Sequence, residues 1–183
     1  IYEAFAARLA ERVGHLQVGA GNEPGVAQGP LINAAGLTKV EAHVADAVAK
    51  GARVLCGGRR HARGGNFYQP TVLADVTSRM QVAREETFGP IAPLFRFSTE
   101  AEAIAMANDT EFGLAAYCFT RDVGRAWRVG EALEYGMVGL NSGLISNEVA
   151  PFGGIKQSGL GREGSKYGLE EYLEVKYLCF AVG

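Results

Sequence analysis

The chain has 183 residues, of which 48% are hydrophobic and 21% charged, a composition that supports an ordinary globular domain and excludes extensive disorder. Its 18 basic and 20 acidic residues leave a net charge of −2 without a basic cluster, which excludes nucleic acid as a partner class. No apolar run is long enough to span a membrane, no signal-peptide pattern opens the sequence, and the distant cysteines (Cys56, Cys118 and Cys179) favour a reducing cytoplasm over a disulfide framework or a zinc site.

The first residues predict an amphipathic helix over 1–16. Ile1, Phe5, Leu9 and Val13 recur every four residues with charged residues between them, which predicts one apolar face. No Ser, Thr, Asp or Asn precedes this helix to cap it, and the first residue is not methionine. We therefore expect the sequence to begin at the cut edge of a longer protein.

A loop rich in Gly and Pro leads to a second predicted helix. Asn33 is in position to cap this helix, and Gly51 follows its end, where a left-handed residue is favoured. The apolar positions with helical spacing are Leu37, Val40, Val44 and Val48. Residues 52–56 then predict a short strand. Residues 67–76 predict an extended segment that Pro70 should confine to an edge or irregular position.

From there on, the predicted elements alternate between strands and helices. The strands are expected at 91–97, 114–120 and 137–141. Thr99, with Glu102 in a capping box, and Asp122 should cap the helices between them. The middle strand is apolar throughout, as in a parallel sheet that is buried on both faces. This order predicts an α/β fold with right-handed crossovers and a parallel sheet, and a ligand site in the loop after the last of these strands.

The end of the sequence predicts a short helix near 166–173 and a last strand at 174–182. Apolar groups stand on both faces of that strand, so its unpaired edge would promote aggregation unless another strand pairs with it. A second subunit or another part of the protein could supply the pairing strand, and the residues leave both alternatives open.

Gly159, Gly161 and Gly164 match the G-x-G-x-x-G spacing of dinucleotide-binding loops. Such a loop follows a buried strand, and an acidic residue closes the next strand about twenty residues later. Here residues 151–158 do not look like a strand, and the residue at the acidic position is Cys179. We therefore expect these glycines to form a tight, closely packed turn and not a phosphate site.

No cysteine or histidine is predicted to be catalytic or to bind a metal. Cys118 and Cys179 stand within apolar strands, as small core residues do, and Cys56, at a strand end before Gly57 and Gly58, has no activating base directly beside it in sequence. The histidines lack metal-ligand spacing and are expected at the surface; they are His15, His43 and His61.

Several segments occur in an order that points to one known family. EETFGP at 85–90 resembles an E-x-F-G-P motif, and PFGGIKQSGLGRE at 151–163 resembles a C-terminal signature. Together with GPLIN (29–33), DTEFGLAAYCFTRD (109–122) and GMVGLN (136–141), they resemble the NAD(P)-dependent aldehyde dehydrogenases. The resemblance covers the whole chain, which would correspond to about the last two-fifths of a complete enzyme.

The resemblance implies a partial α/β catalytic domain over 1–165, followed by a helix and an oligomerisation strand over 166–183. It also implies a homo-oligomer assembled through that strand and NAD or NADP as the cofactor. Glu86 matches the glutamate whose carboxylate accepts hydrogen bonds from the nicotinamide ribose hydroxyls. Phe88 matches the aromatic residue packed beside the nicotinamide ring.

The family's catalytic residues are expected outside this chain. In the family a cysteine thiolate attacks the aldehyde, hydride passes to NAD(P), and a glutamate-activated water hydrolyses the thioester. The cysteine follows a G-Q motif that is absent here, and the glutamate base lies farther upstream. We therefore expect no catalytic residue in this chain, which should be inert alone.

The substrate class is implied by NSGLISNEVAPFGG at 141–154, which resembles the succinate-semialdehyde dehydrogenases and, nearly as well, the glutarate-semialdehyde dehydrogenases. Ser146 matches a serine that binds the distal carboxylate of the small aldehyde substrate, assisted by arginines outside this chain, and Phe152 matches an aromatic of the substrate tunnel. The residues alone favour a loop-capping role for Ser146, and Asn147 is a weaker candidate for the substrate contact. The alternatives are another aldehyde dehydrogenase, or a truncated α/β module that associates without catalysing.

Overall fold

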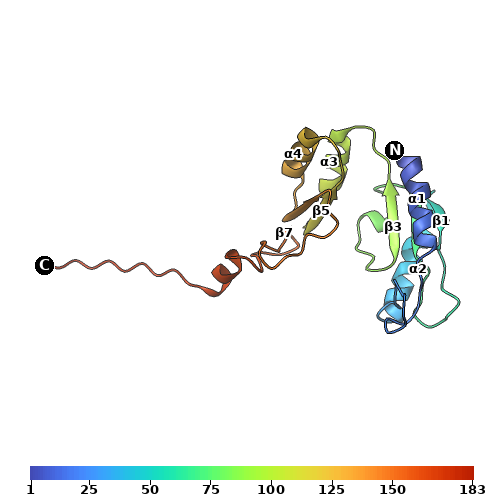
Figure 1. Cartoon of the computed structure of the whole chain (residues 1–183), viewed down its shortest axis with the longest axis horizontal. Coiled ribbons are helices and arrows are strands. Elements are labelled where there is room, and N and C mark those ends of the chain that lie inside the picture. Colours follow the sequence, from blue (N-terminus) through green and yellow to red (C-terminus); the bar gives the residue numbers. More distant parts are fainter. The chain divides into compact units, whose positions relative to one another are not determined.

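The computed structural model describes residues 1–183, which form two compact units, Ile1–Arg96 and Phe97–Gly183 (Figure 1). The first unit holds α1 (Tyr2–Gly14), α2 (Ala34–Ala49), β1 (Arg53–Cys56), β2 (Thr71–Val76), the 3-10 helix η1 (Gln81–Ala83) and β3 (Ile91–Phe95). The second holds α3 (Glu100–Asn108), β4 (Phe112–Gly113), β5 (Ala115–Cys118), α4 (Val123–Ala132), β6 (Met137–Leu140), β7 (Ile155–Lys156) and the 3-10 helix η2 (Tyr167–Tyr172). None of the helices combines the length and the apolar character that crossing a bilayer requires.

The sheet of the first unit has the order β1-β2-β3, with β1 antiparallel and β3 parallel to β2. Pro70 was expected to confine this segment to an edge or irregular position. The central position of β2 excludes the edge, and the pairing of β2 is irregular, with register shifts against both neighbouring strands. The strand begins at Thr71, one residue after the proline. Pro70, which has no N–H to donate, therefore lies outside the strand and costs none of its backbone hydrogen bonds. Thr71 to Ala74 are almost completely buried, as expected for a central strand.

Helix α1 is confirmed, but its predicted apolar face is wrong in the first half of the helix, whereas Leu9 and Val13 are partly buried. Ile1 and Phe5 are exposed, whereas Ala6 is buried and the Tyr2 hydroxyl reaches the sheet. The Arg96 guanidinium also lies 4.0 Å from the centre of the Tyr2 ring. The tyrosine's polar contacts therefore decide which side of the helix faces β2 and β3, and periodicity alone does not reveal them.

Helix α2 supplies most of one side of the hydrophobic core. Asn33 caps it as predicted, because its side-chain oxygen accepts a 2.9 Å hydrogen bond from the Gly36 N–H. Gly51 follows the helix with a φ of +100°, also as predicted. The core around it contains Leu37, Val40, Val44, Ala47, Ala52, Tyr68, Leu73, Val76, Met80 and Val82. Val48 was expected in this set but is exposed, and Ala47 is buried in its place.

The second unit contains the predicted strand–helix–strand element. Strands β5 and β6 pair in parallel and α4 connects them, whereas β3 pairs with β2 instead of joining this sheet. Asp122 caps α4 by accepting from the Arg125 N–H at 3.0 Å. Thr99 caps α3 by accepting from the Glu102 N–H at 3.1 Å. The Glu102 carboxylate accepts from the neighbouring Ser98 N–H, so the capping box is displaced by one residue.

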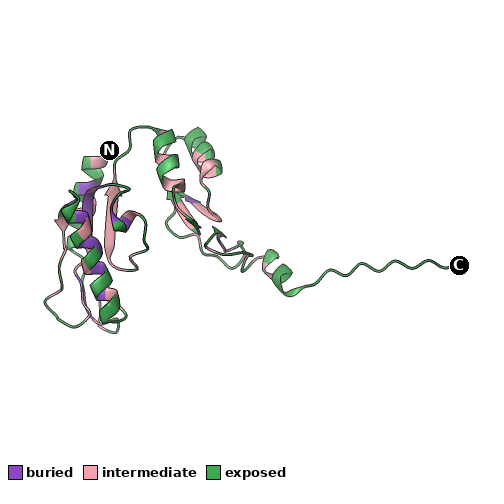
Figure 2. Ribbon diagram, turned by 180° about the vertical axis from the view of Figure 1, so that it is seen from behind, coloured by how far each residue is buried: buried purple, intermediate pink, exposed green.

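Burial differs between the two units (Figure 2). All the buried apolar side chains belong to the first unit. In the second unit β5 was expected to be buried on both faces, yet Tyr117 on that strand is half exposed, as are Trp127 and Phe112. A two-stranded sheet has too little surface to cover both of its own faces, so this unit presents apolar side chains to its surroundings.

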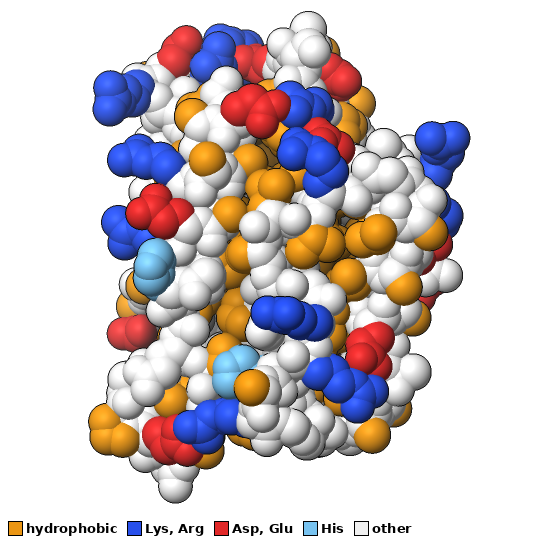
Figure 3. Space-filling model, turned by 90° about the vertical axis from the view of Figure 1, so that its right-hand side faces the viewer, with side chains coloured by type: hydrophobic (Ala, Val, Ile, Leu, Met, Phe, Trp, Pro, Cys, Tyr) orange, Lys and Arg blue, Asp and Glu red, His pale blue; other side chains and the backbone are white.

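Lys and Arg side chains are interspersed with Asp and Glu on the face drawn in Figure 3.

The last segment has no regular structure beyond η2. This 3-10 helix coincides with the predicted short helix. Residues 173–183 carry no strand and are exposed, so the predicted last strand has no pairing partner within the chain. Cys179, expected as a core residue of that strand, is exposed for the same reason.

Candidate functional site

The loop at 84–90 carries the two candidate cofactor residues and joins η1 to β3. Both of its ends are fixed by backbone hydrogen bonds. The Glu85 N–H donates to the Gln81 carbonyl at 2.8 Å, and the Pro90 carbonyl accepts from the Thr71 N–H at 2.8 Å. The loop is therefore held between a short helix and the central strand of the first unit.

Three residues of this loop contact α2 and two do not. Glu85 and Thr87 contact His43 of the helix and Gly89 approaches Val40, although the Glu85 side chain is still 56% exposed; Glu86 and Phe88 are exposed. Gly89 approaches the helix so closely that a Cβ atom on it would lie 2.4 Å from Cγ2 of Val40, which is completely buried. Only glycine allows this approach without displacing the core.

His43 is buried beside the loop, with 2% of its surface exposed, so its expected place at the surface is wrong. Its Nδ1 lies 2.9 Å from Oγ1 of Thr87, and its Nε2 lies 3.5 Å from Oε2 of Glu85. Since a carboxylate can only accept, this arrangement favours a proton on Nε2 and leaves Nδ1 to accept from the threonine hydroxyl.

Glu86 and Phe88 form the exposed side of the loop. The Glu86 carboxylate makes no hydrogen bond or ion pair within the chain, so its oxygens are available as acceptors. The Phe88 ring is 83% exposed, and its φ of +48° lies in the left-handed region that bulky residues rarely adopt. An acceptor-only carboxylate two residues from an apolar ring fits a ligand that presents hydroxyl groups beside a flat aromatic ring.

The candidate substrate residues lie in the second unit, after β6. Ser146 is exposed on the loop that follows this strand. Asn147 has a local role, because its side-chain oxygen accepts from the Val149 N–H at 3.0 Å and forms a turn. Phe152 is partly buried and exchanges two backbone hydrogen bonds with Glu163, of 2.8 and 2.7 Å.

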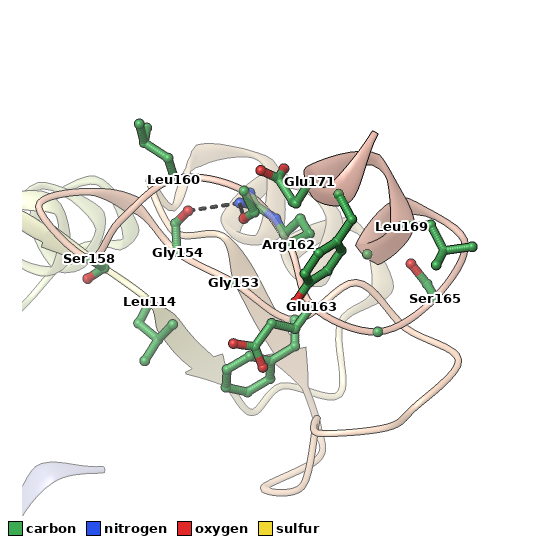
Figure 4. A pocket seen from close by; sticks show the side chains of 15 residues that line it. Leu114, Gly153, Gly154, Ser158, Leu160, Arg162, Glu163, Ser165, Leu169 and Glu171 are labelled. Carbon is green, nitrogen blue, oxygen red and sulfur yellow. Dashed lines mark hydrogen bonds between the residues drawn. The ribbon is translucent and has the colours of Figure 1, made fainter. Parts of the chain in front are cut away.

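Phe152 also lines a recess of about 730 Å³ (Figure 4). The other lining residues include Leu114, Arg162, Leu169, Glu171 and Tyr172, and Ser146 is not among them. The only guanidinium in the lining belongs to Arg162, and its Nη1 donates to the carbonyls of Gly154 at 2.8 Å and Gly161 at 2.6 Å. The structure therefore does not bring Ser146 and Phe152 together in this recess.

The G-x-G-x-x-G glycines form a turn, as expected, and the expected close packing holds for Gly161 and Gly164 but not for Gly159, which has no neighbour within 4 Å of an added Cβ. All three have positive φ angles: Gly159 (+116°), Gly161 (+76°) and Gly164 (+65°). They follow β7 (Ile155–Lys156), so the expectation that residues 151–158 contain no strand is wrong. This strand has only two residues and is antiparallel to β4, and no α-helix begins after the glycines. Backbone approaches are close around this turn, because a Cβ on Gly153 would lie 2.6 Å from the Gly161 carbonyl oxygen. The glycines thus serve packing and turn geometry.

Two residues of the site were missed in the sequence, His43 and Thr87. A signal for His43 was present, because position 43 lies three residues after Val40 and one before Val44, on the apolar side of α2. Thr87 had no such signal, because only the folded loop brings its hydroxyl to the helix. No group of three or more His, Cys, Asp or Glu side chains is arranged to hold a metal ion.

Comparison with known proteins gives a consistent result. Residues 1–178 match the model of the aldehyde dehydrogenase family. The chain is 63% identical over 182 residues to the succinate-semialdehyde dehydrogenase [NADP(+)] GabD of Escherichia coli, and 63% identical over 179 residues to a glutarate-semialdehyde dehydrogenase of Pseudomonas aeruginosa. These alignments cover 100% and 98% of this chain, but only 38% and 37% of the relatives.

The same similarity is found among solved structures. The crystal structure of a succinate-semialdehyde dehydrogenase from Burkholderia pseudomallei superimposes with a TM-score of 0.95 and 65% sequence identity. The superposition covers 99% of this chain and 38% of that one. The chain thus spans well under half the length of the proteins that it matches.

Proposed function

The chain belongs to the aldehyde dehydrogenase family, and from that premise we propose that the full-length protein oxidises succinate semialdehyde to succinate with NAD or NADP. The observation that carries the proposal is the 63% identity to a succinate-semialdehyde dehydrogenase across the whole chain. The name of that relative specifies NADP, and no residue of this chain is assigned to the discrimination between NAD and NADP.

Glu86 and Phe88 are proposed to hold the nicotinamide end of the cofactor, which accepts a hydride when bound. The unpaired carboxylate of Glu86 would accept from two adjacent ribose hydroxyls, and the exposed Phe88 ring would pack beside the nicotinamide. Two features support this role: the hydrogen-bonded ends of the loop, and the packing of Gly89 against Val40. Together they hold the Glu86 and Phe88 side chains on one exposed edge.

The covalent chemistry is proposed to use residues outside this chain. A cysteine thiolate would add to the aldehyde carbonyl and form a thiohemiacetal, which would become a thioester by giving up a hydride to bound NAD or NADP. An activated water would then hydrolyse the thioester, releasing the acid and the free thiolate. The cysteines of the chain are poor candidates: Cys56 and Cys118 are on strands, and Cys179 is on the exposed terminal segment. We infer that the chain contributes binding and shape and not the nucleophile or the base.

Ser146 is proposed to donate a hydrogen bond to the distal carboxylate of the substrate. Its exposure on the loop after the parallel strand β6 supports this, because ligands of such sheets bind beyond the carboxyl ends of the strands. Phe152 is proposed as an apolar wall of the substrate path. A specific observation favours glutarate semialdehyde as the second candidate substrate, since a dehydrogenase of that compound is also 63% identical.

We also propose that the protein is a cytoplasmic homo-oligomer in which residues 174–182 pair with a strand of another subunit. The segment is extended and unpaired here, and its apolar side chains are exposed. An edge of this kind needs a pairing strand to satisfy its backbone and to cover its side chains.

Replacement of Ser146 by alanine in the full-length protein tests the proposed substrate. We expect kcat/KM for succinate semialdehyde to fall by about tenfold, as befits one hydrogen bond to a charged group, with little change for an uncharged aldehyde of similar length. Equal losses for both aldehydes would reject the carboxylate contact.

The length of the substrate is tested on the unaltered protein. Succinate and glutarate semialdehydes differ by one methylene, which an apolar pocket can distinguish by about 10- to 200-fold in kcat/KM. Preference for the shorter aldehyde supports the first candidate, and preference for the longer one supports the second. An enzyme that turns over neither compound contradicts both.

A further inference from the structure

We propose that His43 is a positioning residue for the cofactor loop, holding Thr87 and Glu85 on α2 so that Glu86 and Phe88 project on the opposite side. This inference rests on the proposed function of Glu86 and Phe88, but the contacts that carry it are independent of any cofactor. They come from a histidine that is buried in the first unit and belongs to no other site.

One face of α2 contacts the whole segment from Arg79 to Gly89. Lys50 donates from Nζ to the Arg79 carbonyl at 2.8 Å, and Asp46 accepts from the Gln81 N–H at 2.8 Å. His43 contacts Thr87 and Glu85, and Val40 packs against Gly89. These helix residues follow one another at intervals of three or four, which places them in a single row along α2.

Within this row, His43 is the residue that contacts both chain neighbours of Glu86, which are Glu85 and Thr87. Glu86 between them makes no hydrogen bond or ion pair with the helix and is exposed. If the threonine loses its partner, the loop can rotate about its backbone, and the Glu86 carboxylate is no longer held where two ribose hydroxyls can reach it. The role of His43 is thus to order the loop before the cofactor arrives.

The chain offers variants that separate positioning from packing. Thr87→Val removes the hydroxyl but keeps the shape, and His43→Leu removes both ring nitrogens but keeps an apolar volume. His43→Asn keeps a polar group near the position of Nδ1. Thr38→Val is the matched control, because the Thr38 hydroxyl donates to the Ala34 carbonyl on the same helix at 3.0 Å and does not touch the loop.

The experiment measures two properties of the full-length protein: the Kd for NAD and NADP by titration, and hydrogen–deuterium exchange of the peptide spanning 84–90 without cofactor. For Thr87→Val and His43→Leu we expect a Kd about three- to tenfold higher, as the loss of one hydrogen bond implies, and faster exchange of the loop. The double variant should be no worse than His43→Leu alone. His43→Asn should recover part of the affinity, and Thr38→Val should leave both properties unchanged.

Unchanged affinity in His43→Leu and Thr87→Val, with only a lower melting temperature, would overturn the positioning role and leave a packing role. Additive losses in the double variant would also overturn it, because the two side chains would then act separately. If the unaltered protein binds neither NAD nor NADP, the proposed function fails. The exchange of the loop still decides in that case whether His43 holds residues 85–87 in place.

Discussion

The hydroxyl of Tyr2 accepts a 2.7 Å hydrogen bond from the backbone N–H of Asp75. The same hydroxyl donates to the carbonyl of Leu94 at 3.2 Å, so the first turn of α1 is joined to both β2 and β3. Asp75 has a φ of +59° and lies where the pairing of β2 with β3 shifts its register. The tyrosine thus satisfies a backbone group that the irregular strand leaves without a ladder partner.

Tyr2→Phe should lower the free energy of unfolding by about 1–3 kcal/mol, because the Asp75 N–H loses its acceptor while the ring is retained. Denaturant unfolding with a probe in the first unit measures the loss. Tyr172→Phe serves as the control, since that side chain is 87% exposed and its replacement should be neutral. Equal stability of the two variants would contradict the role of the hydroxyl.

Gly89→Ala should destabilise the first unit by about 1–3 kcal/mol through overpacking against Val40. Gly14→Ala is the control and should leave the stability unchanged or higher. Nothing lies within 4 Å of the added methyl group, and alanine favours the helix. Thermal unfolding of both variants checks the contrast. Adding Val40→Ala to Gly89→Ala should restore the native loop exchange rate, and a failure to do so would indicate that the clash lies elsewhere.

Phe88→Gly should leave stability equal or higher by up to about 1 kcal/mol, because the left-handed backbone costs a bulky residue more than glycine loses in chain entropy. The same change should raise the KM for NAD or NADP, because the apolar wall is lost. Phe97→Gly is the matched control: Phe97 is also exposed but lacks a positive φ, so it should only lose stability. A Phe88→Gly variant that is less stable than Phe97→Gly would refute the strain.

Glu100 should remain ionised in strongly acidic solution. Arg128 first and Arg125 second lower the pKa of its carboxyl from 4.5 to about 2, through hydrogen bonds that join α3 to α4. Since the folded state has the lower pKa, this contribution to stability is complete above pH 4.5 and is lost as the pH falls toward 2. An NMR titration of the carboxyl carbon should show the low midpoint, and Arg128→Met should move it upward. An unchanged midpoint in Arg128→Met would disprove the assignment.

Local chemistry made much of the fold predictable. Asn33, Thr99 and Asp122 were recognised as helix caps because a cap uses a side chain only a few residues from the amide it binds. The strands at 91–95 and 137–140 were predicted from short apolar runs. Helix caps and short apolar runs depend on residues that are close together in the chain, so they can be recognised in the sequence without knowledge of the fold.

The errors concern contacts between distant residues. The face of α1 depends on Tyr2 reaching Asp75, and the burial of His43 depends on a loop more than 40 residues away. The central place of β2 depends on which strands pair with it on either side. In the candidate site, the exposure of Glu86 and Phe88 suits their predicted roles, and those roles and that of Ser146 stay predictions.

The contact between Val40 and Gly89 has a practical consequence for protein engineering. One valine belongs at once to the core and to the floor of the loop, so the loop at 84–90 cannot be exchanged as a separate cassette. A chimera that takes this loop from a relative needs the matching α2 as well, and the pair forms the smallest unit that can be grafted. Directed evolution of cofactor use should accordingly randomise positions on the helix together with positions on the loop.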